Sequence, residues 1–337
     1  MGQPDFTVDV YQNEHLPEGA RDVNAIVTVT TAGAPSAAPV AQMSRAEIIV
    51  IDCSESMTAP PSKIAEAQAA ATAALDVIRD GVDFAVIAGT DLAVPVYPSV
   101  AGLVVAESQT IQWAKRAVAD LLPGGGTAMG QWLRLAHELF SSHPSHLRHA
   151  TLLTDGKNDD ETSDELDAAI KLCEGVFSCD CRGVGAGWEV AQLRRISAAL
   201  LGTVDILPGP ATLAADFSAM MLAAMGQQVA DVALRIWTPQ HASIQFVKQV
   251  APTVEDLTDR CTQSGPQTSD YPSGAWGTGE TRDYHLRVRV VPGTVGQEML
   301  VARVSLITPS PTGPEVLGEG RVRAIWTNDQ ALSAPVM

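Results

Sequence analysis

The stretch EIIVIDCSESM, residues Glu47–Met57, decides the fold of this protein. An unbroken apolar run ends at Asp52, the pattern of a strand that is buried on both faces of a parallel sheet covered by helices. Open sheets of this kind bind their ligands at the carboxyl ends of the strands, which is where Asp52 lies. Alternate residues of an extended loop point the same way, so we expect Asp52, Ser54 and Ser56 to converge on one point, with Cys53 and Glu55 turned away.

A carboxylate and two hydroxyls form an all-oxygen ligand set, which suits Mg²⁺, Mn²⁺ or Ca²⁺ rather than Zn²⁺ or copper. One loop cannot complete such a site, and two other stretches offer complementary ligands. The run Gly124-Gly-Gly-Thr127 opens a helical pattern, and Ala150–Asp155 is a second apolar strand that ends in an acid. The glycines favour a close approach of the Thr127 loop, because glycine accepts backbone conformations that other residues avoid.

Together these three stretches resemble the von Willebrand factor A (VWA) domain, in particular its bacterial members. The metal-ion-dependent adhesion site (MIDAS) of that family is Asp-x-Ser-x-Ser, a distant Thr, and an Asp just after the fourth strand. The matching positions here are Asp52, Ser54, Ser56, Thr127 and Asp155. The resemblance implies a non-enzymatic module whose Mg²⁺, Mn²⁺ or Ca²⁺ ion accepts an Asp or Glu carboxylate from a partner protein. One departure is Glu55, where the family usually has a small residue; its carboxylate would raise the metal affinity or repel an acidic partner.

Around these motifs, predicted strands alternate with predicted helices, which indicates an α/β, doubly wound, mostly parallel six-stranded sheet of the Rossmann-like type. The strand order 3-2-1-4-5-6 would place the strands of Asp52 and Asp155 side by side. The strands after the first are expected at Asp83–Ala88, Leu92–Tyr97 (the antiparallel edge), His149–Thr154, Phe177–Val184 and Thr203–Leu207. The helices are expected at Ser62–Arg79, Ser108–Leu121, Ala128–Ser141, Ser163–Glu174, Val190–Leu200 and Leu213–Met225.

Both ends of the chain show the alternation of half-buried strands instead. The early runs are Phe6–Tyr11 and Val23–Thr30, and a turn that begins at Leu16 is expected between them. Several more runs follow Gln228. We therefore predict a VWA domain inserted into a β-sandwich that is built from both ends of the chain. The predicted parts are 5–44 (sandwich strands and a linker at Thr31–Ser44), 45–227 (VWA domain), 228–327 (sandwich) and 328–337 (tail).

The composition narrows the class of partner and the compartment. Among 337 residues, 22 Lys and Arg against 39 Asp and Glu give a net charge of −17, which argues against nucleic acid or an anionic membrane as partner. Five cysteines without a regular framework favour a reducing compartment. No signal peptide and no apolar run long enough to span a bilayer are evident. These features predict a cytoplasmic protein.

Three further groups of residues could carry chemistry. His143, His146 and His149 could suggest a metal site, but they straddle a proline-containing turn and a strand start, which favours a polar surface loop. Cys173, Cys179 and Cys181 lack zinc-finger spacing, so buried thiols are the default. An acidic run could form a rim that selects a basic partner, although solvated acids at a helix N-terminus are favoured; it comprises Asp159, Asp160, Glu161, Asp164, Glu165 and Asp167.

Two rival functions stay open. A Mg²⁺-dependent aspartyl phosphohydrolase would need a second acid two residues after Asp52, where Ser54 stands. No lysine follows the glycine run as a P-loop requires, and no Gly-x-Ser-x-Gly elbow is present. The second rival is a metal-free scaffold that uses the β-sandwich surface. Our prediction is the metal-dependent interaction module, and the resemblance suggests a MoxR-type AAA+ ATPase or a signalling component as its partner.

Overall fold

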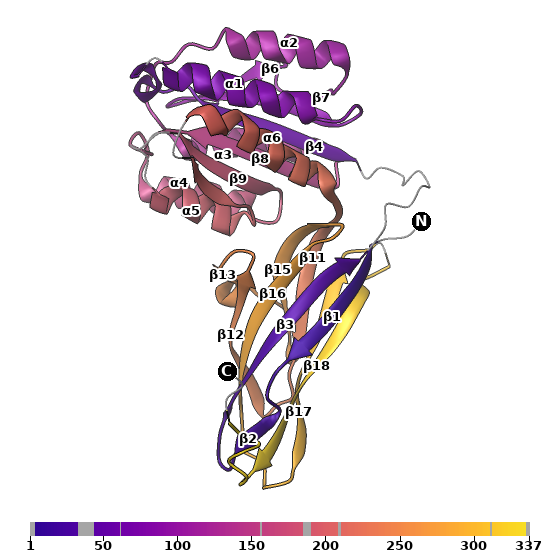
Figure 1. Cartoon of the computed structure of the whole chain (residues 1–337). Helices are drawn as coiled ribbons and strands as arrows, with labels where there is room; N and C mark the ends of the chain where they lie inside the picture. The colour runs from indigo at the N-terminus through magenta and orange to yellow at the C-terminus, as the bar shows by residue number, and fades with distance from the viewer. Residues whose placement is uncertain are drawn as a thin grey trace. The chain divides into compact units, whose positions relative to one another are not determined.

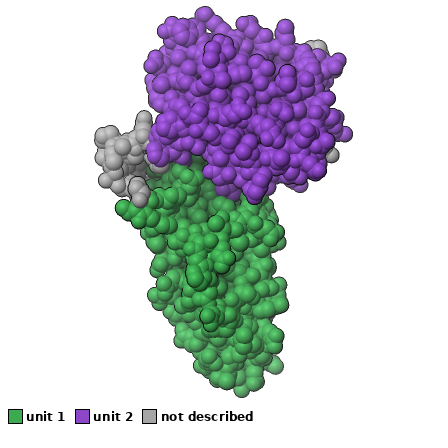
Figure 2. Space-filling model, turned by 180° about the vertical axis from the view of Figure 1, so that it is seen from behind, with its two compact units in different colours: residues 1–41, 227–337 green, residues 42–226 purple. Residues whose placement is uncertain are grey.

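The computed structural model describes residues 4–32, 44–60, 62–155, 157–184, 190–207, 210–310 and 312–334. The chain forms two compact units, shown in different colours in Figure 2. Unit 1 comprises Met1–Ala41 and Gln227–Met337, and unit 2 comprises Gln42–Gly226. Among the described helices, none is both long and apolar enough to cross a membrane.

Unit 2 is built on one mixed sheet in the order β10-β9-β8-β4-β5-β6, with β7 paired to β5. This path is the predicted order 3-2-1-4-5-6, and among the described strands only β6 and β7 run antiparallel to their neighbour. The prediction of six strands was wrong, because β7 adds a seventh that is only two residues long, too short for any sequence periodicity. The strands are β4 (Arg45–Asp52), β5 (Asp83–Gly89), β6 (Ala93–Tyr97), β7 (Val104–Val105), β8 (Leu147–Thr154), β9 (Ser178–Val184) and β10 (Val204–Leu207).

Three helices cover each face of this sheet (Figure 1). One layer is α1 (Ser62–Val77), α2 (Ser108–Ala119) and α6 (Pro210–Gly226), and the other is α3 (Met129–Ser141), α4 (Ser163–Cys173) and α5 (Val190–Ala199). The central strand β4 serves both layers, since Ile49 and Ile51 enter the first core while Ile48 and Val50 enter the second. Burial on both faces explains the unbroken apolar run that ends at Asp52.

Unit 1 contains two sheets that share one core. The first has the order β1-β3-β16-β12-β13 and the second the order β14-β15-β11-β17-β18-β2. Tyr284 of the first sheet and Leu234, Trp276 and Trp326 of the second are all buried in this common core. The strands are β1 (Asp5–Tyr11), β2 (His15–Pro17), β3 (Asp22–Ala32), β11 (Gln227–Trp237), β12 (Ala242–Ala251), β13 (Glu255–Asp256), β14 (Thr262–Gly265), β15 (Thr268–Gly277), β16 (Thr281–Val290), β17 (Glu298–Thr308) and β18 (Glu315–Thr327).

Some local expectations for unit 1 were wrong. The sequence gives no strand signal for β15 because Pro272, Gly274 and Gly277 are turn formers; Gly274, at φ +77°, lies at a register irregularity against β11. The turn expected from Leu16 begins only after the short strand β2, which pairs with β18. The predicted linker lies largely outside the described residues, at 33–43.

Candidate metal centre

The sheet brings the two acid-bearing loops together. Strand β4 lies between β5 and β8 and runs parallel to both. Its register places Asp52 opposite Gly89 on one side and Ile51 opposite Leu153 on the other. The loops that follow β4 and β8 therefore leave the same edge of the sheet as neighbours, as the strand order predicted.

A continuous chain of hydrogen bonds links four of the five predicted ligands. The Asp52 carboxylate accepts from the Ser54 backbone N–H at 2.8 Å and from the Thr154 hydroxyl. The hydroxyls of Ser54 and Ser56 are 2.9 Å apart, and Ser56 Oγ donates to Asp155 Oδ1 at 2.6 Å. Asp52, Ser54, Ser56 and Asp155 thus form one cluster of oxygen atoms contributed by two loops.

Thr127 joins this cluster through the backbone of its loop. The Glu55 N–H donates to the Gly125 carbonyl at 2.9 Å, and the Gly124 N–H donates to the Cys53 carbonyl at 2.7 Å. Gly125 adopts φ +85°, a conformation that favours glycine, so this tight apposition depends on the glycine run. The Thr127 hydroxyl itself is not part of the chain of hydrogen bonds described above.

The cluster is buried toward the sheet and reaches the surface at one residue. Asp52 is 0%, Ser54 1%, Asp155 2% and Thr127 6% exposed, whereas Ser56 is exposed. Cys53 enters the core and Glu55 is exposed, so both turn away from the cluster as expected. The extended loop expected here was wrong beyond Ser54, because Glu55–Thr58 forms a short 3-10 helix.

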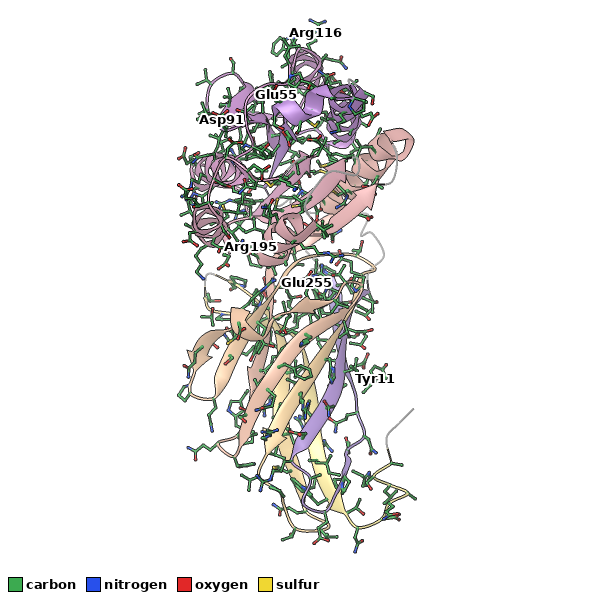
Figure 3. All side chains as sticks on the ribbon, turned by 90° about the vertical axis from the view of Figure 1, so that its left-hand side faces the viewer. Tyr11, Glu55, Asp91, Arg116, Arg195 and Glu255 are labelled. Carbon is green, nitrogen blue, oxygen red and sulfur yellow. The ribbon has the colours of Figure 1, made fainter. Side chains whose placement is uncertain are left out.

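Two acids border the glycine loop on the surface. Figure 3 labels Glu55, whose backbone is bonded to Gly125, and Asp91, whose carboxylate accepts from the Gly126 N–H at 3.4 Å. Both residues are exposed. The departure from the family pattern at Glu55 therefore adds negative charge at the rim of the cluster rather than a group inside it.

The electrostatics of the cluster favour a cation. Burial raises the pKa of Asp52, and the charge of Asp155 raises it further, while hydrogen bonds from Ser54 and Thr154 act in the opposite direction. A cation between the loops would relieve both the burial cost and the repulsion of these carboxylates. The donors are hydroxyl and carboxylate oxygens only, so the residues present fit Mg²⁺, Mn²⁺ or Ca²⁺.

A clamp that the sequence did not reveal holds the Thr127 loop in place. Asp160 Oδ2 accepts from the Thr127 N–H at 2.7 Å, Asn158 Oδ1 from the Met129 N–H at 2.6 Å, and Glu161 Oε1 from the Gly130 N–H at 2.6 Å. These N–H groups lie at the start of α3, where backbone donors lack partners within the helix. Asp160 is exposed and Glu161 is half-buried at a helix N-terminus, as expected of the acidic run, but the helix start that they bind is that of α3, which precedes them in the chain.

Lys63 contacts the oxygen cluster directly and was also missed by sequence reasoning. Its ammonium forms an ion pair with Asp155 Oδ2 and donates to the Ser56 carbonyl at 3.2 Å. The side chain of Lys63 is 19% exposed and that of Asp155 is 0% exposed. Lys63 is the second residue of α1, so the fold brings the start of this helix to the two acid-bearing loops.

His149 lies in a strand, as the expected run His149–Thr154 indicated, but the polar surface environment expected for it was wrong, because it is buried within β8. It is 3% exposed, with Nδ1 2.7 Å from Glu47 Oε2 and Nε2 3.0 Å from Asp180 Oδ2. Burial lowers the pKa of His149, but the charge of Glu47 and hydrogen bonds with Asp180 and Glu47 outweigh it and raise the pKa to about 10. For Asp180, burial acts to raise the pKa, but the interactions with His149 and Thr203 outweigh it and lower the pKa to about 2.

The other metal candidates lead to no site. Within the described parts of the chain, no group of three His, Cys, Asp or Glu side chains is arranged to hold a metal ion. The five cysteines are free; four are buried, as expected for structural thiols, and Cys261 is exposed.

Comparisons with known proteins agree with this architecture. The von Willebrand factor type A domain matches residues 47–206. The solved structure of a von Willebrand factor type A protein from Catenulispora acidiphila is 47% identical, with a TM-score of 0.93, over 99% of this chain and 76% of that chain. The ArnB paralog VWA2 from Sulfolobus acidocaldarius has a TM-score of 0.58 at 12% identity, covering 97% of this chain and 78% of that one, a likeness of fold alone. The comparison of this chain with curated proteins found no match. Because the protein from Catenulispora acidiphila is 47% identical and matches 99% of this chain, this chain belongs to the von Willebrand factor type A family.

Proposed function

We propose that this protein is a non-enzymatic, divalent-metal-dependent protein-interaction module. In this proposal a MIDAS holds Mg²⁺, Mn²⁺ or Ca²⁺ and is formed by Asp52, Ser54, Ser56, Thr127 and Asp155. The observation that carries the proposal is the unbroken chain of hydrogen bonds from Asp52 to Asp155, which joins oxygen ligands of two loops and reaches the surface at Ser56.

The hydrogen bonds prepare these residues for a metal. The Ser56 hydroxyl donates its proton to Asp155 and therefore accepts from the Ser54 hydroxyl, which leaves one lone pair of Ser56 available for coordination. Asp52 is held by the Ser54 backbone N–H and the Thr154 hydroxyl, which fixes the direction of its carboxylate. When bound, the metal would act as a Lewis acid that attracts an anion. Because several of its ligands are neutral hydroxyls, it would keep positive charge for an Asp or Glu of a partner protein.

Three related proposals accompany this one. The two-sheet core of unit 1 and its assembly from both ends of the chain support a β-sandwich into which the VWA domain is inserted. Five free cysteines support a cytoplasmic location. The resemblance to bacterial VWA proteins suggests a MoxR-type AAA+ ATPase or a signalling component as the partner to examine first.

Calorimetric titration with Mg²⁺ and with Mn²⁺ tests the proposal. We expect the wild-type protein to bind one ion and the double variant Ser54→Ala/Ser56→Ala to bind at least about tenfold more weakly, which corresponds to about 1.4 kcal/mol. Ser141→Ala, an exposed serine at the end of α3, is the matched control and should bind like the wild type. Equal binding by all three proteins, or no binding by any, would contradict the proposed site.

A second experiment separates the rival functions. Immobilised wild-type protein should capture its partner in Mg²⁺ and release it in EDTA, whereas the double variant should not capture it. Capture that is insensitive to EDTA and to the variant would instead support the metal-free scaffold. Mg²⁺-dependent phosphatase or ATPase activity that is abolished by Asp52→Asn would support the phosphohydrolase.

A further inference from the structure

We infer that Lys63 is a tethered cation that competes with the divalent metal for Asp155 and thereby lowers the metal affinity of the site. This inference rests on the function proposed above and concerns a residue outside the five-residue motif. Its basis is the ion pair between the Lys63 ammonium and Asp155 Oδ2, together with the 3.2 Å hydrogen bond from Lys63 Nζ to the Ser56 carbonyl.

Both oxygens of the Asp155 carboxylate are engaged. Oδ1 accepts from the Ser56 hydroxyl at 2.6 Å, and Oδ2 accepts from the Lys63 ammonium. The Asp155 side chain is 0% exposed, so the ammonium provides much of the charge compensation that this buried carboxylate requires. A metal ion or a metal-bound water that approaches Asp155 must share the carboxylate with Lys63 or displace it.

Lys63 is well placed to be displaced. It is the second residue of α1, and a positive charge at a helix N-terminus opposes the helix dipole. The first turn of α1 contains no acidic residue that would offset this cost. The side chain of Lys63 is 19% exposed, and its ammonium lies at the end of a flexible four-carbon stem. The ammonium can therefore turn outward into water.

The consequence is a site of reduced and adjustable affinity. Mg²⁺ and the Lys63 ammonium repel each other if both stay near Asp155, and the ion pair must break if the lysine leaves. Either route weakens the binding of the metal alone. A partner carboxylate on the metal would offset the excess positive charge, so metal and partner should strengthen each other's binding by the same factor.

The test is Mn²⁺ binding to the full-length protein, followed by calorimetry and by the electron paramagnetic resonance signal of free Mn²⁺. Lys63→Met should bind Mn²⁺ about tenfold more tightly than the wild type, and Lys63→Arg, which keeps the charge, should stay close to the wild type. Lys115→Met is the matched control: Lys115 is 17% exposed and paired with Asp76 on α1, outside the cluster, and its loss should not change Mn²⁺ binding.

Thermal unfolding provides a second readout, and its measurement in EDTA does not depend on the metal affinity. In EDTA, Lys63→Met should unfold at a lower temperature than the wild type, because Asp155 loses its counter-charge; saturating Mn²⁺ should then raise its midpoint by more than it raises that of the wild type. Equal or weaker Mn²⁺ binding by Lys63→Met, while the wild type binds, would overturn the role of Lys63 and leave the metal site standing. Absence of Mn²⁺ binding by both proteins would overturn the metal site and this inference with it.

Discussion

Replacing the buried His149 by Leu should destabilise unit 2 by about 3 kcal/mol. The side chains of Glu47, His149 and Asp180 are 0%, 3% and 14% exposed, and loss of one partner of a buried ion pair costs about 3–5 kcal/mol. The lower end applies because each acid keeps another donor: Arg45 Nη1 lies 3.1 Å from Glu47, and the Thr203 N–H lies 2.6 Å from Asp180. For a unit of this size, 3 kcal/mol lowers the midpoint by about 6–12 °C.

The pKa shifts fix how this effect depends on pH. The pKa of His149 rises from 6.5 to about 10 in the folded protein, so its contribution is complete below pH 6.5 and is lost as the pH rises through about 10. The pKa of Asp180 falls from 3.8 to about 2, so its contribution is complete above pH 3.8 and is lost as the pH falls through about 2. The difference between wild type and His149→Leu should therefore be largest between pH 4 and 6.5 and shrink toward pH 10.

Scanning calorimetry at pH 6, 8 and 9.5 measures this difference. His146→Leu is the matched control, because His146 is exposed five residues after the end of α3 and its loss should change the midpoint little. A His149→Leu midpoint equal to that of the wild type at pH 6 would refute the buried ion-pair argument. So would a difference that grows with pH.

Three further predictions concern the clamp and the thiols. Asp160→Ala removes the acceptor of the Thr127 N–H and should lower the free energy of unfolding, measured by chemical denaturation, by about 1.5–3 kcal/mol. It should also weaken Mn²⁺ binding. Unchanged binding would show that the Thr127 loop needs no clamp. Gly126→Ala should have a similar effect on Mn²⁺ affinity, because an added Cβ would lie 2.1 Å from the Asp160 carboxylate; calorimetric titration measures the loss, and wild-type affinity would contradict it. A thiol reagent should modify Cys261 alone in the native protein and all five cysteines in denaturant, as counted by absorbance; rapid native reaction of a second thiol would contradict the described burial.

The main strands of unit 2 were predictable because each has a clear pattern, whereas their order came from the general doubly wound arrangement. The continuous apolar run before Asp52 is typical of a strand covered on both faces, and Asp155 ends a similar run. By contrast, β7 has two residues and β15 contains turn formers, so neither has a periodicity that could be recognised.

The motif residues could be proposed from the sequence, but the residues that support them could not. Asp52, Ser54 and Ser56 are close in the chain, although extended-chain alternation holds only as far as Ser54, because Ser56 lies in the 3-10 helix Glu55–Thr58. Lys63 reaches Asp155 from 92 positions away, and Asp160 reaches Thr127 from 33, so neither contact has a local signature. His149 was misjudged because its neighbours are those of a turn, while its burial depends on Glu47 and Asp180 in the adjacent strands.

A crystal structure of the protein grown with Mn²⁺, with anomalous diffraction recorded at the manganese absorption edge, tests the metal site most directly. Our account predicts one anomalous peak between the loops after β4 and β8 and the glycine loop. It should lie about 2.1–2.3 Å from the hydroxyl oxygens of Ser54, Ser56 and Thr127, close to the distances usual for such cations. An anomalous peak only at the surface acids, or none at all, would contradict the metal-dependent function.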